Sequence, residues 1–189
     1  MATITDEDRS ALLKLARSTI EAELIKGVKV IRPEKMTSVL KENRGCFVTL
    51  HKDGALRGCI GTIEAVMPLA ASVEENALNA AFRDPRFSSL EEKELKNTNI
   101  EISVLTVPQE LSFKDKEDLK KKLKKGVHGV ILSSGRQKAT FLPQVWEQLP
   151  EVEKFLEHLC IKAGMDRNCW KNKTTRVQTY EAEFFSESA

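Results

Sequence analysis

The sequence lacks any run of about 18 consecutive apolar residues, the length that a transmembrane helix requires. Its N-terminus, which includes Asp6, Glu7 and Asp8, is acidic and has neither the positive start nor the apolar stretch of a secretory signal. We therefore expect no membrane span and no export, and we predict a cytoplasmic location.

An excess of charge of one sign is missing too, because 30 lysines and arginines are balanced by 28 acidic residues, a net charge of +2. This small charge gives no reason to expect nucleic acid or an anionic membrane as a partner. The four cysteines, at positions 46, 59, 160 and 169, include no Cys-x-x-Cys pair and no zinc-ligand spacing. We predict four reduced thiols, no metal and no other cofactor.

The chain contains 41% hydrophobic and 31% charged residues over 189 positions, a balance typical of folded globular proteins. Strand and helix patterns are mixed without regular alternation, and two of the connections are hairpins. We predict an α+β fold in which helices flank an antiparallel sheet, within a single domain at residues 5–187. This length suffices for one large core or for two modest subdomains that share a cleft.

Helical spacing of apolar residues predicts four helices, at residues 5–26, 68–83, 115–125 and 151–163. The first begins with Thr5 and Asp8, the pattern of a capping box. Strands are predicted at residues 45–51, 55–60, 100–104, 127–132, 137–141 and 175–185. The first two form a hairpin, because Asp53 and Gly54 are a strong signal for a two-residue turn.

The strand after this turn contains the hexapeptide Leu56-Arg57-Gly58-Cys59-Ile60-Gly61. In a regular hairpin Leu50 pairs with Arg57 and Val48 pairs with Cys59. One face then carries residues 46, 48, 50, 57 and 59, and the other carries residues 47, 49, 51, 56 and 60. This register places His51 on the wrong face to act as a base for Cys59.

Glycine on both sides of Cys59 is unusual, since glycine destabilises a strand. Gly58 and Gly61 therefore indicate a bulge, or a close approach by a ligand or by backbone. A functional reading makes Cys59 a reactive thiol whose thiolate is favoured by Arg57. In the structural alternative Cys59 is a small buried hydrophobic residue, and the glycines only let the helix after Pro68 pack closely.

The hexapeptide resembles the hallmark of the AMMECR family of conserved cellular proteins. Further blocks resemble that family in the same order, at residues 79–87, 102–106, 140–146, 162–165 and 181–184, so that the likeness extends from about residue 8 to residue 185. The resemblance implies an intracellular protein with a larger and a smaller subdomain around a cleft, and a suspected site at Arg57, Gly58 and Cys59. It implies no established reaction. It also suggests a Memo-like protein and a radical SAM enzyme as protein partners.

Several other residues are candidates for a site. Arg83 and Arg86 flank Asp84 and either form a structural corner or bracket an anion. Glu101 is a candidate general base or a partner for Arg57. His128 lies close to two glycines, Gly126 and Gly129, and is a candidate site histidine.

Two further segments have an ordinary reading beside a functional one. Gln144, in an aromatic segment with Phe141 and Trp146, is a candidate ligand-binding residue, although core packing explains the aromatic residues. The lysines between positions 120 and 125 suggest RNA binding. Acidic residues precede them, however, and this order of charges favours a solvated helix over a nucleic-acid partner.

Three hypotheses follow. The first is an enzyme in which Cys59 acts as a nucleophile or as a thiol acid or base, Arg57 stabilises the thiolate, and His128 or Glu101 assists. The second is a non-catalytic adaptor or complex subunit. The third is an RNA-binding protein. The sequence determines no oligomeric state.

Overall fold

The structure is a computed structural model that describes residues 3–172 and 174–187. Over these residues no helix is long and apolar enough to cross a membrane. The chain divides into two compact units, which we name unit 1 (Met1–Leu105 and Glu183–Ala189) and unit 2 (Thr106–Ala182). Each strand pairing is antiparallel, as in an α+β fold. We describe each unit by itself.

Unit 1 begins with α1 (Asp6–Leu24) and the short α2 (Ser38–Lys41). The predicted hairpin follows as β1 (Cys46–Lys52) and β2 (Ala55–Thr62), and α3 (Leu69–Phe82) comes next. The 3-10 helix η1 (Glu92–Asn97) leads into β3 (Thr98–Leu105). The strands are ordered β2-β1-β3, so β2 lies at the edge of this sheet.

Local signals explain why these elements form. Thr5 and Asp8 make the predicted capping box, in which each side chain accepts a hydrogen bond from the other residue's backbone N–H. Asp53 and Gly54 both adopt positive φ, 51° and 80°, as the two-residue turn between β1 and β2 requires. The predicted first helix and first hairpin are therefore confirmed.

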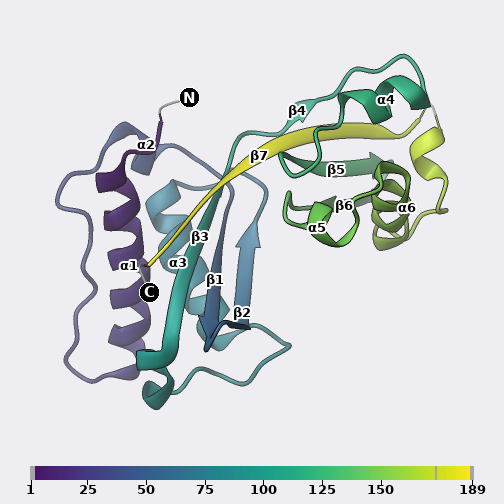
Figure 1. Ribbon diagram of the computed structural model, residues 1–189. Helices are drawn as coiled ribbons and strands as arrows, with labels where there is room; N and C mark the ends of the chain where they lie inside the picture. The colour runs from purple at the N-terminus through teal and green to yellow at the C-terminus, as the bar shows by residue number, and fades with distance from the viewer. Residues whose placement is uncertain (1–2, 173, 188–189) are drawn as a thin grey trace. The chain divides into compact units, whose positions relative to one another are not determined.

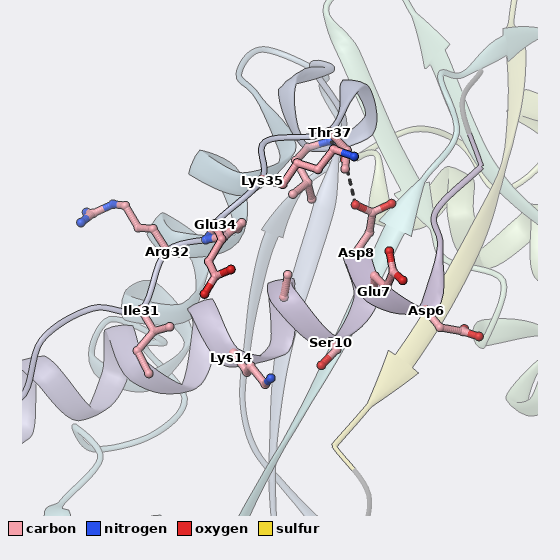
Figure 2. A pocket seen from close by; sticks show the side chains of 13 residues that line it. Asp6, Glu7, Asp8, Ser10, Lys14, Ile31, Arg32, Glu34, Lys35 and Thr37 are labelled. Carbon is pink, nitrogen blue, oxygen red and sulfur yellow. Dashed lines mark hydrogen bonds between the residues drawn. The ribbon is translucent and has the colours of Figure 1, made fainter.

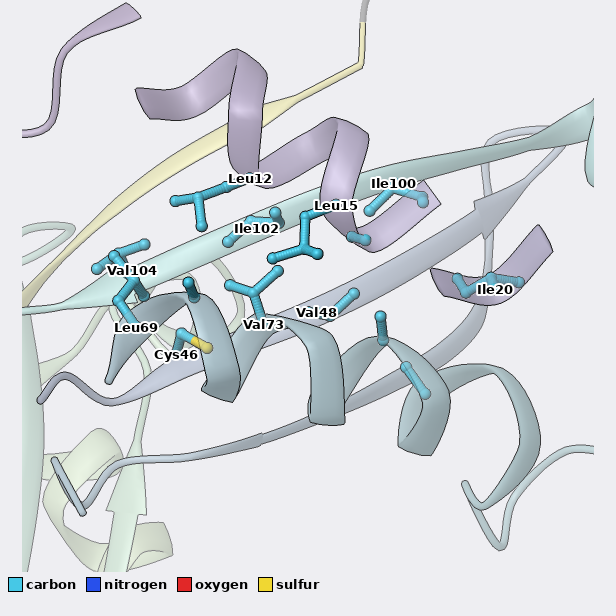
Figure 3. Packing of buried hydrophobic residues seen from close by; sticks show 14 of the residues in the cluster. Leu12, Leu15, Ile20, Cys46, Val48, Leu69, Val73, Ile100, Ile102 and Val104 are labelled. Atoms are coloured by element: carbon cyan, nitrogen blue, oxygen red, sulfur yellow. The ribbon is translucent and has the colours of Figure 1, made fainter. Parts of the chain in front are cut away.

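The core of unit 1 lies between its sheet and the helices α1 and α3, which cover the same face of the sheet (Figure 1). Figure 3 shows side chains from both helices, among them Leu15 and Val73, directed toward the side chains of β1 and β3. Fully buried strand residues alternate along β1 and β3, and they include Cys46, Val48, Leu50, Ile100 and Ile102. The opposite face, which α1 and α3 leave uncovered, is named the open face below.

The register of the hairpin differs from the regular one that we predicted. Pairing starts as expected with Lys52 opposite Ala55, but it shifts by one residue between His51 and Leu50. Leu50 consequently faces Gly58, and Thr49 faces Cys59. The prediction of a bulge beside Gly58 is confirmed, whereas the predicted pairing of Val48 with Cys59 is wrong. The physical reason is the extra residue, Arg57, which moves the rest of β2 to the opposite parity.

Unit 2 contains β4 (Gln109–Glu110), α4 (Lys116–Lys122), β5 (His128–Ser134) and β6 (Gln137–Phe141). It continues with α5 (Val145–Gln148), α6 (Val152–Lys162), the 3-10 helix η2 (Cys169–Lys171) and β7 (Arg176–Ser186), whose last residues belong to unit 1. β7 pairs with β4 and β5.

A separate core stabilises unit 2. The indole ring of Trp146 stacks on Phe155 with centroids 3.7 Å apart, and Phe141 meets Phe155 edge to face. Core packing therefore accounts for the aromatic residues around Gln144. The predicted second hairpin is confirmed, with a turn of two residues, since Ser134 pairs with Gln137.

The prediction of four reduced cysteines is wrong for two of them. Cys160, at the end of α6, and Cys169, at the start of η2, are joined by a disulfide, whereas Cys46 and Cys59 are free thiols. The absence of a Cys-x-x-Cys pair misled the prediction. The chain reverses direction after α6, so that Cys169, nine residues after Cys160, lies beside it with the two Cα atoms 6.0 Å apart.

Because this disulfide closes a short loop, the chain-entropy estimate for its contribution to stability is about 2–3 kcal/mol. We expect dithiothreitol to lower the free energy of unfolding of the native sequence by that amount in urea titrations. The Cys169→Ala variant should be less stable from the start and indifferent to dithiothreitol. Equal stability of the native protein with and without reductant would show that the bond contributes nothing.

Candidate functional site

Cys59 lies on the open face, in a row of three side chains that crosses the sheet of unit 1. Its cross-strand partner in β1 is Thr49, whose own partner in β3 is Glu101. The hydroxyl of Thr49 donates a hydrogen bond to Sγ of Cys59 at 3.2 Å. All three side chains are partly exposed. The reading in which Cys59 is a buried hydrophobic residue does not hold, and we name these residues the thiol row.

His51 shares the open face with the thiol row, contrary to the sequence-based conclusion that it lies on the wrong side. It is opposite Leu56 on one strand and opposite Asn99 on the other. The bulge at Arg57 is the reason, because it moves Cys59 to the parity of Thr49 and His51. His51 is one row from the thiol, and diagonal neighbours in a sheet are about 7–8 Å apart.

Asp84 and Arg86 hold the backbone of Cys59 at the edge of the sheet. The N–H of Cys59 donates to Oδ2 of Asp84 at 2.9 Å, and its carbonyl oxygen accepts from Nη2 of Arg86 at 3.2 Å. Arg86 and Asp84 form an ion pair at 2.6 Å, and the Asp84 side chain is only 2% exposed. The hydrogen bond from Arg86, assisted by backbone N–H groups, holds the pKa of Asp84 well below its ordinary value.

These contacts support the structural reading of the segment after α3. Arg83, the third charged residue of the group, bonds to Asn79 of α3 through Nη1 at 3.1 Å. Arg86 donates hydrogen bonds from both Nε and Nη2 to the carboxylate of Asp84. The segment therefore forms a corner that pairs the outer backbone groups of an edge strand, which otherwise lack partners. An anion-binding rim stays a prediction without a contact that supports it.

Arg57 is engaged with Glu94 of η1 and not with Glu101, which corrects the proposed pairing. Its Nε and Nη2 atoms bond to the two oxygens of Glu94 at 3.1 and 3.0 Å, and both side chains are 11% exposed. Nη1 donates to the carbonyl oxygen of Ser88. The hydrogen bonds from Arg57, and then from Lys52, lower the pKa of Glu94 to about 2.

The glycines of the hexapeptide have packing reasons. A Cβ atom at Gly58 would lie 2.2 Å from the carbonyl oxygen of Ala80 in α3, so this position requires glycine. At Gly61 it would lie 2.4 Å from the ring of Phe47, which covers this part of the strand. Close packing of α3 is therefore confirmed at Gly58, and it accounts for this glycine without a bound ligand.

The other predicted site residues, His128 and Gln144, belong to unit 2. Nδ1 of His128 accepts a hydrogen bond from the N–H of Lys124 at 3.3 Å, and burial together with the charge of Lys124 lowers the pKa of His128. The carbonyl oxygen of His128 accepts from Nε1 of Trp146 at 2.7 Å. Oε1 of Gln144 is buried and has no hydrogen-bond partner in the part of the chain that the structure describes. A ligand role for Gln144 stays a prediction.

The lysine-rich helix has partners of its own. Lys120 pairs with Glu117 and Glu153, and Lys122 pairs with Asp118. These pairs fit a solvated helix with acidic residues at its start and basic residues at its end. They give no support to RNA binding.

A pocket of about 620 Å³ lies between the first turns of α1 and the segment that precedes α2 (Figure 2). It is bordered by charged residues such as Lys14 and Glu34, and Thr37 donates to the buried Asp8 at 2.8 Å, the dashed line in Figure 2. No residue of β1, β2 or β3 lines it. It is therefore separate from the thiol row.

No group of three or more histidine, cysteine or acidic side chains is arranged to hold a metal ion among residues 3–172 and 174–187. The thiol row by itself offers one thiol, one hydroxyl and one carboxylate. Such a set suits a nucleophile, a hydrogen-bond donor and a base.

Sequence reasoning missed two residues that shape this site. The regular register placed Cys59 on the face opposite to Thr49, so that this pair was missed, and Glu94 was not considered. Gly58 was the signal that could have identified the pairing of Thr49 with Cys59, since a bulge beside this glycine moves Cys59 to the opposite face of the strand. Glu94 belongs to a short 3-10 helix without a periodic pattern, so no signal identified it.

Comparisons with known proteins agree with the family resemblance. The family model AMMECR1 matches residues 13–185. A protein of Methanothermobacter thermautotrophicus is 38% identical over 188 residues, which cover 98% of this chain and 97% of that protein. A protein of Aquifex aeolicus is 38% identical and covers 85% of this chain and 84% of its own length. The crystal structure of an uncharacterised protein from Pyrococcus horikoshii superposes with a TM-score of 0.82 at 36% identity, over 94% of this chain and 90% of that one.

Proposed function

This chain belongs to the AMMECR1 family, and the cysteine of its hallmark hexapeptide lies on the open face, so we propose that the protein is an enzyme with Cys59 as its reacting thiol. The observation that carries the proposal is the hydrogen bond from the hydroxyl of Thr49 to Sγ of Cys59, at 3.2 Å. A donor aimed at the sulfur stabilises negative charge there. The two residues before Cys59 have structural roles, because Arg57 forms an ion pair with Glu94 and Gly58 packs against α3, whereas the side chain of Cys59 has neither role.

The reaction class that fits is acyl transfer. Sγ of Cys59 attacks the carbonyl carbon of an activated acyl donor, such as a thioester, and a new S–C bond forms. The bond from that carbon to the leaving group breaks, and the leaving group departs with its electron pair and with the proton that the thiol releases. Water or an amine then takes the acyl group and regenerates the thiol.

Thr49 and Glu101 supply the path for the proton. A hydroxyl can accept from one neighbour while it donates to another, because its hydrogen rotates. Thr49 lies between the thiol and Glu101, with cross-strand Cβ atoms about 5 Å apart at each step. Glu101 thus acts as the base through Thr49, and His51, one row away, is the alternative base. Arg57 has no part in the chemistry here, because Glu94 neutralises it.

Trapping tests this proposal. The protein is incubated with a panel of acyl thioesters of increasing chain length and analysed by intact mass and peptide mapping. We expect one acyl adduct, located at Cys59, that hydroxylamine removes and that the Cys59→Ala variant does not form. The Cys46→Ala variant is the matched control and should retain the adduct, because Cys46 is fully buried. Acylation at several lysines, or none at Cys59, would contradict the proposal.

A second candidate function is an adaptor that binds a protein partner, as the resemblance to the AMMECR family suggests for a Memo-like protein or a radical SAM enzyme. The observation in its favour is Leu56, a large apolar residue on the open face that is 43% exposed beside His51. An adaptor would form no adduct at Cys59, and replacement of Leu56 would disturb its function more than replacement of Cys59. The same trapping experiment therefore separates the two functions.

A further inference from the structure

A second pocket of unit 1, about 660 Å³ in volume, lies where the β1–β2 turn and the start of β3 meet α1. His51 and Asn99, cross-strand partners on the open face, line it together with Glu21 and Arg17 of α1. A volume of this size suits a small organic ligand.

The wall of this pocket contains an ion pair of partly buried side chains. Arg17 and Glu187 form an ion pair in which each side chain is only about a fifth exposed, at 21% and 22%. Arg17 also donates to the carbonyl oxygen of Thr98 at 2.6 Å, and Glu187 accepts from the N–H of Ile100 at 2.9 Å. These bonds fix the wall before any ligand arrives, which reduces the entropy that binding costs.

Other polar and ionisable side chains of the pocket have no such partners. The side chains of Glu21, His51, Asp53 and Lys96 make no hydrogen bond or ion pair with the residues that the structure describes. Glu21 and His51 are half-buried. A ligand of complementary charge can therefore pair with these groups without displacing an existing partner.

The pocket adjoins the thiol row through His51. His51 and Thr49 are two residues apart on the same face of β1, a spacing of about 7 Å along a strand. A molecule anchored in the pocket can therefore extend along the open face toward Cys59. This continuity makes the pocket the place for the polar end of a substrate.

We propose that this pocket binds a zwitterionic ligand, an amino acid or a short peptide with a free ammonium and a free carboxylate. The ammonium pairs with Glu21 and Asp53, and the carboxylate pairs with Lys96 and accepts a hydrogen bond from His51. The inference rests on the proposed function in one respect, since it identifies the bound group as the polar end of the acyl donor, whose carbonyl carbon extends along the open face to Cys59.

Calorimetric titration with triglycine tests the binding step in the Cys59→Ser variant, which removes the thiol and keeps the pocket. We expect triglycine to bind at least about tenfold more tightly than N-acetyltriglycine, which lacks the ammonium, or triglycinamide, which lacks the carboxylate. The Glu21→Gln variant should lose a similar factor. The Glu23→Gln variant changes an exposed residue of the same helix outside the pocket, and it should bind as the parent does.

Equal affinity for triglycine and its two singly charged analogues would overturn the inference, and so would an equal loss in the Glu23→Gln and Glu21→Gln variants. Tight, Glu21-dependent binding of triglycine supports it whether or not Cys59 becomes acylated. A protein that binds triglycine and forms no adduct at Cys59 retains the pocket and refutes only the acyl-transfer proposal.

Discussion

The Gly58→Ala variant is expected to unfold with a free energy about 3 kcal/mol lower than that of the parent protein. The added Cβ would lie 2.2 Å from the carbonyl oxygen of Ala80, which is a backbone atom of α3. Because a backbone oxygen has no rotamer by which to move away, α3 or β2 must shift. Urea unfolding followed by circular dichroism measures the loss.

Gly54→Ala is the matched control for this prediction. Gly54 lies in the turn of the same hairpin, where an added Cβ meets nothing within 4 Å but φ is +80°. Its cost is conformational and amounts to about 1–2 kcal/mol. If Gly58→Ala costs less than Gly54→Ala, the close packing of α3 on the hexapeptide is not what Gly58 provides.

The Arg57→Ala variant should also lose about 3 kcal/mol, because it leaves the carboxylate of Glu94 buried with Lys52 as its remaining cation. The pH dependence identifies the cause. Glu94 has a pKa of about 2 in the folded protein and an ordinary value of 4.5, so its contribution to stability is complete above about pH 4.5. It is lost as the pH falls toward 2. The parent and the variant should therefore converge in stability over that range.

Lys93→Ala is the control for the ion pair of Arg57 and Glu94, since Lys93 pairs with Glu91 at the surface, where both side chains are more than half exposed. We expect no measurable change in stability. An Arg57→Ala variant that is as stable as the parent, yet is no longer acylated at Cys59, would return Arg57 to a chemical role.

Much of the fold of unit 1 could be predicted because its elements are long and their signals agree. The capping box at Thr5, the Asp53-Gly54 turn and the alternation around Ile100 and Ile102 each have a local cause that tertiary contacts do not override. The shorter elements, such as α2 and η1, gave no periodic signal, because four to six residues are too few to show one.

The site was harder to predict, since it depends on one residue of register. Arg57 is the inserted residue, and although Gly58 indicated a bulge, no local pattern told which residue of the strand was inserted. The regular register therefore excluded His51 and overlooked Thr49. The partner of Arg57 was also out of reach, because Glu94 lies 37 residues away and only the folded chain brings the two together.

The cysteines illustrate the same limit. The spacing of the cysteines gave no reason to distinguish Cys59 from Cys160. In the fold, however, Cys59 is a partly exposed thiol and Cys160 is buried in a disulfide. Burial and partners, which decide how a thiol reacts, are properties of tertiary structure.

Competitive alkylation tests whether Cys59 is the reacting thiol and whether Thr49 activates it. The native protein is treated with iodoacetamide at pH 7.5, and the rates at Cys59 and Cys46 are followed by peptide mass spectrometry. We expect modification at Cys59 with Cys46 protected, and at least about a threefold slower rate at Cys59 in the Thr49→Val variant. The hydroxyl of Thr62 accepts a hydrogen bond from the backbone N–H of Glu64 and does not contact the thiol, so the Thr62→Val variant should leave that rate unchanged. Protection of Cys59 equal to that of Cys46 would show that Cys59 is not the reacting thiol, and a rate that Thr49→Val does not alter would show that Thr49 does not activate it.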